Sequence, residues 1–305
     1  MSARDTVTFY LPPHLRQRAE RGNHNFITKV SEVLTDAGLA VALDDDDRPA
    51  RQRALDRPGR GLYLMDPPVN ARGLTFRKTY IYPFWRIEKG PTRWDWPVAQ
   101  EMFDPQAVDA RKAANFYRLW RQRLYDDEPA HARADGFVYV PLQGQLLRQR
   151  SFQSCCPLDM IKAVLAHDAG RQVVATLHPS ETYTVAEHRA LEQLASQEDR
   201  LMIGAAGPAR YLQNCDYIVT QNSAVGFEGY FFGKPLVLFG KSDFHHIALN
   251  VTDKGAQSAI AAVETHKPDY AAYLFWFLQQ RSINAGRPEA KERIRTVLRG
   301  HGWPV

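Results

Sequence analysis

The stretch from Asp216 to Gly240, DYIVTQNSAVGFEGYFFGKPLVLFG, most constrains what this chain can fold into. DYIVT and KPLVLFG have strand patterns, QNS supplies residues that begin helices, and AVGFEGYFF can form a short helix. We expect the polar turn to lie at the carboxyl edge of a parallel sheet. Helix N-termini at such edges present unpaired backbone N–H groups and a partial positive charge. An anionic group such as phosphate is therefore the first ligand to expect.

The residues before this stretch show the same alternation of apolar strands and amphipathic helices. Strands are expected at residues 137–143, 171–179 and 201–205, and helices at residues 157–170, 184–197 and 207–215. Successive βα units with apolar strands imply a parallel sheet covered on both faces. Its ligands should bind at the carboxyl ends of the strands.

The first half of the chain also begins as an α/β domain. TVTFYLP (residues 6–12), LAVALD (39–44) and GLYLMD (61–66) read as strands, and residues 24–38 read as an amphipathic helix closed by a glycine. A chain of 305 residues fits two domains. The polar, Pro- and Gly-containing segment Glu128–Gly136 is the expected linker, which gives domains at residues 1–134 and 135–305. Two further helices are expected at residues 268–283 and 288–300.

Composition sets only broad limits on function. A hydrophobic fraction of 44% is ordinary for a globular protein, and a net charge of +5 favours acidic partners mildly. No window approaches the roughly 18 to 20 continuous apolar residues that span a bilayer, so we expect a cytoplasmic protein. Lys and Arg are dispersed, which argues against nucleic acid as a partner. The cysteines, Cys155, Cys156 and Cys215, are expected in or near the core.

Three other segments have candidate chemistry, each with an alternative. The four aspartates Asp44–Asp47 could suggest a metal site, but a solvated charge run in a loop is the preferred interpretation. The aromatic and basic stretch Thr75–Trp96 suits either an acidic sugar or packing between domains. Asp243, His245 and His246 are a weak metal candidate, because adjacent histidines rarely converge on one ion.

Three polar motifs, Pro141–Gln143, His178–Glu181 and Gln221–Glu228, each follow an expected strand and should converge on one sheet edge. His178, fixed in its turn by Pro179, can donate to a phosphate and neutralise the charge on a departing nucleotide. The alternative is a histidine that only caps the strand end through a structural hydrogen bond.

The last of these motifs supplies the remaining candidates. Ser223, beside Asn222, can cap the following helix and bind a phosphate. Glu228 can accept hydrogen bonds from a ribose diol, or can pair with a neighbouring cation. Gly226 leaves room for backbone or ligand to approach closely. Gln143 and Lys234 are the further polar residues that we assign to the same cleft.

The order PLQ, then HP after a strand, then NSAVGFEGYFFGKPLVLFG resembles the C-terminal half of the capsule polysaccharide biosynthesis proteins, which are similar to bacterial Kdo transferases. The resemblance spans residues 137–248. It implies a GT-B-like α/β fold, with two Rossmann-like domains whose parallel sheets face a cleft and C-terminal helices that pack across. The first domain would bind the acceptor and the second the nucleotide sugar.

The resemblance also implies a function. The protein would be a glycosyltransferase that moves an acidic, Kdo-like sugar from a CMP-activated donor to a glycan or glycolipid, without an essential metal. Peripheral association with capsule assembly machinery at the inner membrane is compatible with this role. His178 and Ser223 would contact the donor phosphate, and Glu228 would hold the ribose.

This sequence departs from the family pattern at one point. The family usually places an aspartate of proposed catalytic role shortly after PLQ, whereas here PLQGQLLRQRSF is followed by no acid until Asp159. Two alternatives therefore stay open: a non-catalytic nucleotide-binding protein of capsule assembly, and a nucleotide-sugar epimerase or hydrolase on the same architecture.

Overall fold

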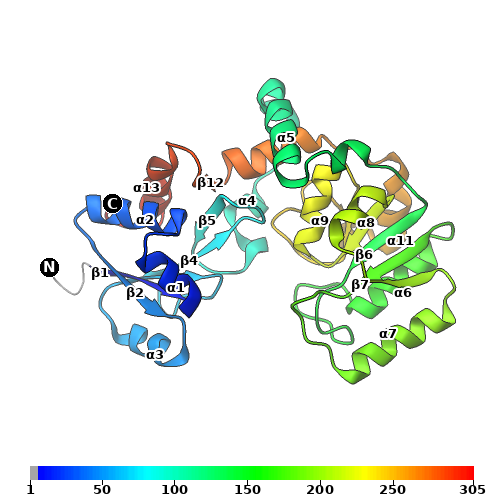
Figure 1. Cartoon of the computed structure of the whole chain (residues 1–305), viewed down its shortest axis with the longest axis horizontal. Helices are drawn as coiled ribbons and strands as arrows, with labels where there is room; N and C mark the ends of the chain where they lie inside the picture. The colour runs from blue at the N-terminus through cyan, green and yellow to red at the C-terminus, as the bar shows by residue number, and fades with distance from the viewer. Residues whose placement is uncertain (1–5) are drawn as a thin grey trace. The chain divides into compact units, whose positions relative to one another are not determined.

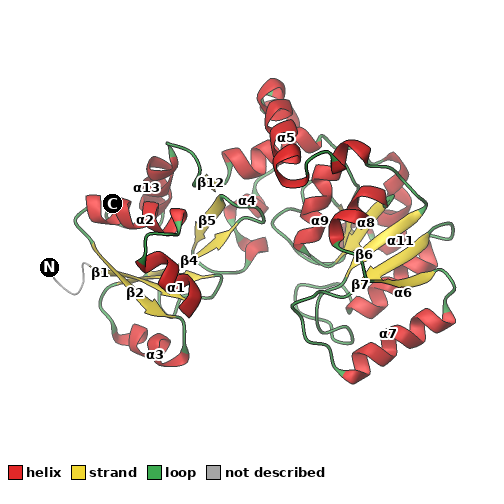
Figure 2. Ribbon diagram, viewed as in Figure 1, coloured by secondary structure: helices red, strands yellow, loops and turns green. Residues whose placement is uncertain are grey.

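The computed structural model describes residues 6–305. Its contacts divide the chain into a first unit, Met1–Trp96 with Phe277–Val305, and a second unit, Pro97–Trp276. Each unit is an α/β assembly around a six-stranded sheet, as expected from the alternating pattern. Figure 1 follows the chain by residue number, and Figure 2 separates helices from strands. In residues 6–305, no helix is both long and apolar enough to span a bilayer.

The sheet of the first unit is mixed, in the order β12-β5-β4-β3-β1-β2. Four strands, β2, β1, β3 and β4, are parallel, and β5 and β12 are antiparallel to their neighbours. The strands are β1 (Thr6–Leu11), β2 (Ala40–Asp45), β3 (Arg60–Leu64), β4 (Gly73–Lys78), β5 (Phe84–Glu88) and β12 (Ile283–Asn284). The helices are α1 (Pro13–Glu20), α2 (Asn25–Asp36), α3 (Arg48–Asp56) and α13 (Ala290–Gly300).

The two faces of this sheet are covered unequally. Val7, Phe9 and Leu11 of β1 pack with apolar residues of α2 and α13 in one core. Tyr10 and Tyr63 lie in a smaller cluster with alanines of α3. Figure 1 shows α2 and α13 on one side of the β1–β2 region and α3 on the other. The alternation of apolar residues along β1 therefore places a large core on one face and a small one on the other.

The sheet of the second unit is parallel throughout, in the order β11-β10-β9-β6-β7-β8. Its strands are β6 (Phe137–Pro141), β7 (Gln172–Thr176), β8 (Leu201–Gly204), β9 (Tyr217–Thr220), β10 (Leu236–Leu238) and β11 (Leu249–Asn250). Its helices are α4 (Pro97–Gln100), α5 (Ala110–Tyr125), α6 (Pro157–His167), α7 (Val185–Gln197), α8 (Pro208–Asn214), α9 (Ala224–Gly229), α10 (Val251–Lys254), α11 (Ala256–Ala261) and α12 (Tyr270–Leu274). The strand order reverses between β6 and β9, which is the point where open parallel sheets bind ligands.

The units differ from the domains expected from sequence. Helix α5 precedes the expected boundary but packs against α12 in the second unit, and α13 follows it but packs against α2 in the first. The expected linker Glu128–Gly136 is held by backbone hydrogen bonds from Arg133 to Gln213 (2.9 Å) and from Asp135 to Asn214 (3.0 Å). The chain passes between units at residues 96–97 and 276–277 instead.

The four aspartates span the end of β2 and the short connection to α3, instead of lying in the long solvated loop expected from sequence. Strand β2 continues through Asp45, and α3 begins at Arg48 with Asp47 as its N-cap. The other three aspartates form ion pairs: Asp44 with Arg53 and Arg57, Asp45 with Arg16, and Asp46 with Arg51. These carboxylates therefore stabilise the local fold.

The stretch Thr75–Trp96 contributes mainly to the core of the first unit. Phe76, Phe84 and Trp85 are at least 95% buried. The Trp85 ring stacks on Phe26 at a centroid distance of 4.6 Å, and the Arg86 guanidinium lies over the Phe277 ring at 5.1 Å. Of the two interpretations of this stretch, a site for an acidic sugar or packing between domains, the packing role fits these buried rings better. The packing, however, lies within the first unit and not between domains.

Candidate functional site

Strands β6 and β9 of the second unit end side by side at the reversal of strand order. Gln143 lies two residues beyond β6, and its Oε1 accepts a hydrogen bond from the Asn222 backbone N–H at 3.4 Å. The motif His178–Glu181 follows β7, which pairs with β6 in parallel. The structure therefore brings the three expected motifs to one edge of the sheet.

His178 is exposed and is held in a defined orientation. Its Nδ1 accepts a hydrogen bond from the Ser180 backbone N–H at 3.2 Å, and its own backbone N–H donates to the Tyr183 hydroxyl at 2.8 Å. A neutral imidazole that accepts at Nδ1 carries its proton on Nε2. His178 therefore offers an Nε2–H donor at the carboxyl edge. Pro179, also exposed, is the second residue of the same turn.

Ser223 is the N-cap of α9, as expected: its Oγ accepts a hydrogen bond from the Val225 backbone N–H at 3.3 Å. The residue is only 5% exposed. Asn222 is 3% exposed, and its Nδ2 donates to the Lys241 carbonyl at 3.0 Å. The capping role of Ser223 is thus confirmed, and its contact with a phosphate stays a prediction.

Gly226 lets α9 lie close to the sheet. A Cβ atom at Gly226 would lie 3.0 Å from the Thr220 side chain and 3.1 Å from that of Leu236, and one at Gly229 would lie 2.0 Å from that of Ile218. Both glycines are therefore required by packing between helix and strand, whether or not a ligand approaches.

Glu228 and Lys234 have partners within the second unit. Glu228 accepts a hydrogen bond from the Tyr125 hydroxyl at 3.1 Å, and burial together with the Glu228 charge raises the pKa of Tyr125. The Lys234 ammonium donates to the carbonyls of Arg133 and Cys215 at 2.6 Å each. Because Lys234 comes just before β10, it lies at the amino end of that strand, and its assignment to the cleft was wrong.

The loop between β6 and α6 carries a cation that sequence reasoning missed. The Arg150 guanidinium lies over the Phe152 ring at 4.9 Å, and its Nε and Nη2 are buried without a hydrogen-bond partner in residues 6–305. Burial lowers the pKa of Arg150, and the nearby Glu181 charge opposes that shift. A half-buried guanidinium whose buried N–H groups are unused favours an anionic ligand.

This loop also reaches the end of β10. Ser154 N–H donates to the Phe239 carbonyl and Lys241 N–H to the Phe152 carbonyl, both at 2.8 Å. The loop therefore spans the edge from β6 to β10 and holds Arg150 there. The two arginines in LLRQRSF, Arg148 and Arg150, are the sequence signal for this cation.

The weak metal candidate is a structural pair. The rings of His245 and His246 stack at 4.4 Å, and their Nε2 atoms donate to the carbonyls of Ala99 (2.9 Å) and Val98 (3.0 Å). Burial lowers the pKa of His246 to about 4, and the neighbouring His245 adds to the lowering. Both imidazoles are thus engaged within the second unit.

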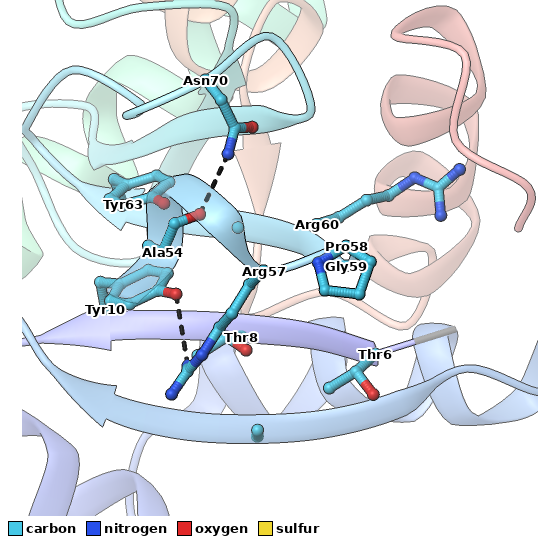
Figure 3. Close-up of a pocket in the computed structure, with 12 residues that line it drawn as sticks. Thr6, Thr8, Tyr10, Ala54, Arg57, Pro58, Gly59, Arg60, Tyr63 and Asn70 are labelled. Atoms are coloured by element: carbon cyan, nitrogen blue, oxygen red, sulfur yellow. Dashed lines mark hydrogen bonds between the residues drawn. The ribbon is translucent and has the colours of Figure 1, made fainter. Parts of the chain in front are cut away.

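The first unit contains a separate cavity of about 280 Å³ on the α3 side of its sheet (Figure 3). The rings of Tyr10 and Tyr63 stack 4.5 Å apart along one side, and Arg57 donates to the Tyr10 hydroxyl at 3.4 Å. Its lining also includes Thr6, Thr8, Ala42, Ala54, Pro58, Gly59, Arg60, Gly61 and Asn70. Because Thr6 and Arg60 begin their strands, the cavity extends toward the amino ends of β1 and β3, unlike the edge described above.

Several solved structures are similar to this chain. KpsC, beta Kdo 2,7 transferase, from Thermosulfurimonas dismutans is 15% identical, with 88% of each chain covered and a TM-score of 0.52. The beta Kdo 2,4 transferase of the same KpsC is 11% identical, with 88% of each chain covered and a TM-score of 0.48. A Methanocaldococcus jannaschii UDP-GlcNAc 2-epimerase is 10% identical over 97% of this chain and 99% of that chain, with a TM-score of 0.41. The first of these shows the shared fold.

A comparison with curated protein sequences gives no match. The model of the family described as capsule polysaccharide biosynthesis protein matches residues 100–287. This range includes the whole sheet of the second unit and the three motifs at its carboxyl edge. Because the match covers more than half of the 305 residues, this chain belongs to the capsule polysaccharide biosynthesis protein family.

Proposed function

We propose that this protein is a glycosyltransferase of capsule synthesis that transfers an acidic, Kdo-like sugar from a CMP-activated donor to a glycan or glycolipid. The family and the Kdo-transferase-like fold support a glycosyltransferase-like role. The observation that carries the proposal is the open Nε2–H donor of His178 beside the point where the parallel sheet reverses.

The donor phosphate is the group that this edge suits best. His178 Nε2–H would donate to a phosphate oxygen and stabilise the charge that develops there as the bond between sugar and phosphate breaks. Arg150 and the exposed Lys241 add positive charge at the same edge. Because these cations supply charge that a metal would otherwise provide, we propose that donor binding needs no essential metal.

The remaining contacts follow the family resemblance. Ser223 would bind the same phosphate, and Glu228 would accept from the ribose hydroxyls, exchanging its hydrogen bond with Tyr125. The acceptor would be recognised by the first unit. Peripheral attachment at the inner membrane would place the acceptor within reach.

A protein that binds the donor without transferring it is the second candidate. The absence of an acid between Gln143 and Asp159 favours it, because glycosyl transfer needs a group that takes the proton of the acceptor. An epimerase or hydrolase would use the same phosphate and ribose contacts.

Thermal unfolding with added nucleotides tests the donor assignment. CMP and CMP-Kdo should raise the midpoint, and His178→Ala should remove most of the shift. Loss of a charge-assisted hydrogen bond costs about 1.5 to 3 kcal/mol, roughly tenfold or more in affinity.

His167→Ala is the matched control, because His167 is exposed at the C-terminal end of α6, at the opposite edge of the same sheet. It should leave the CMP shift unchanged. Equal stabilisation by all nucleotides, or none by cytidine nucleotides, would contradict the assignment.

A further inference from the structure

One carboxylate at the carboxyl edge of the second unit forms no hydrogen bond or ion pair within the described part of the chain. Glu181 is exposed, and its side chain makes no hydrogen bond or ion pair with residues 6–305. Its backbone is nevertheless placed, because its N–H donates to the His178 carbonyl at 3.2 Å. Glu181 and His178 therefore belong to one turn after β7.

The acids nearest the other strand ends of this unit are engaged or buried. Asp159 accepts from Lys162 at 3.0 Å, Glu187 accepts from the Leu146 backbone N–H at 2.6 Å, Glu228 accepts from Tyr125, and Asp243 is fully buried. Each of these carboxylates would have to share its oxygens with an existing partner, or become exposed, to take a proton from a ligand. Glu181 needs no such change.

Glu181 also lies against the start of the loop that follows β6. A Cβ atom built on Gly144 would lie 2.4 Å from Glu181 Oε2 and 3.0 Å from its Cδ, so the carboxylate occupies space that any side chain at position 144 would need. Gly144 directly follows Gln143, which bonds to Asn222 at the reversal of strand order. The carboxylate is thus next to the point where this sheet is expected to hold its ligand.

We propose that Glu181 is the general base of the transfer, an inference that rests on the function proposed above. The Glu181 carboxylate takes the proton from the acceptor hydroxyl while that oxygen forms a bond to the anomeric carbon of the donor sugar. The bond between this carbon and the phosphate oxygen breaks, and its electron pair stays on the departing CMP. His178 Nε2–H donates to that oxygen, so one residue of the turn serves the acceptor and the other serves the leaving group.

This placement accounts for the loop composition after β6. That loop has no acid before Asp159 and instead carries Arg150, whose charge interacts with Glu181. A carboxylate from the neighbouring β7 turn fills the space beside Gly144. The base therefore comes from a different loop than the sequence pattern suggests.

Glu181→Gln is the first test, because the side chain is exposed and the variant should fold normally. Transfer from CMP-Kdo to an acceptor glycan should fall by about 10² to 10⁴, the usual contribution of a general base. The affinity for CMP, obtained from the thermal shift that CMP produces, should stay within about twofold of the wild-type value. Transfer within about threefold of wild type would overturn the base role while leaving the glycosyltransferase assignment intact.

A wild-type chain that binds CMP but transfers sugar to no acceptor would contradict the proposed function and the base role together. The two failures are therefore distinguishable.

Chemical rescue separates a base from a structural residue: formate added to Glu181→Ala should restore part of the lost transfer rate. No rescue, with full CMP binding, would count against proton transfer by this carboxylate.

Gly144→Ala changes the position of the Glu181 carboxylate and leaves its chemistry intact. The added methyl group must displace Glu181, so we expect kcat to fall at least tenfold with the KM for the donor little changed. Gly207→Ala is the control, because a Cβ atom at Gly207, which follows β8, meets nothing within 4 Å. Equal kcat values for the two variants would contradict the position assigned to Glu181.

Discussion

Acidic residues lie at the end of strand β2 of the first unit and in the turn after strand β7 of the second, but they are used differently. At the end of β2, Asp44–Asp47 each have an arginine partner or a capping role. In the turn after β7, Glu181 has no such partner among residues 6–305, and His178 keeps one ring nitrogen available. The difference shows that partners, rather than the number of charges, distinguish a candidate site from a stabilising cluster.

The two sheets explain part of this difference. The first unit follows β2 with α3, whose arginines return to the aspartates of the strand. The second unit follows β7 with a turn, and its capping box of Thr184 and Glu187 begins α7 without using Glu181. Bonded acids should therefore govern stability, and the unbonded acid should govern chemistry.

Asp168→Asn should give the largest loss of stability and would show whether this rule also holds inside the second unit. Asp168 is 6% exposed and accepts hydrogen bonds from the Tyr217 hydroxyl at 2.9 Å and from Arg171 at 3.0 Å. Hydrogen bonds to a charged group contribute about 1.5 to 3 kcal/mol each. Urea unfolding at pH 7 should show a loss of about 2 kcal/mol.

The pH dependence of this variant has a defined sign. Burial alone would raise the pKa of Asp168, but the hydrogen bonds from Tyr217 and Arg171 outweigh burial and hold it below the ordinary value. The stability gained is present above a pH of about 4 and is lost as the pH falls through the lower folded pKa. The gap between wild type and variant should therefore shrink below about pH 4, and a constant gap would contradict this account.

Asp46→Asn should have a smaller effect and sharpens the comparison between the two strand ends. Asp46 receives two hydrogen bonds from Arg51, at 2.6 and 3.1 Å, in a partly exposed pair. We expect a loss of about 1 kcal/mol in the free energy of unfolding, with transfer activity unchanged. Glu181→Gln is the matched change of acid to amide, and its unfolding free energy should stay within about 0.5 kcal/mol of wild type. A larger loss of unfolding free energy for Glu181→Gln than for Asp46→Asn would contradict the distinction between bonded and unbonded acids.

Much of the architecture could be predicted because its signals are local. The apolar strands and the helices between them follow from periodicity, and parallel connection then brings Gln143, His178 and Asn222 to one edge. Helix α3 escaped prediction because its sequence, RPARQRALD, is polar and arginine-rich, which looks like a loop without its aspartate partners. The contacts divide the chain at other residues than the expected boundary, because packing between α5 and α12, and between α13 and α2, has no local sequence signal.

The site was predicted less completely than the fold, for a physical reason. Residue type and strand position placed His178 at the carboxyl edge, where the structure has it, but only the three-dimensional contacts show that Ser223 and Glu228 already have partners. Arg150 and Glu181 are recognised because polar atoms of their side chains lack hydrogen-bond partners among the described residues, which a sequence cannot show. Lys234 could have been excluded from sequence, since it precedes its strand and so lies at the amino edge.

Incubation of the intact protein with CMP-Kdo and a panel of capsular glycan or glycolipid acceptors tests the central claim most directly. Mass spectrometry should show an acceptor that gains one Kdo residue as CMP is released, and His178→Ala should slow both. Release of CMP only at the rate of hydrolysis in water, with no mass gain on any acceptor, would contradict the account.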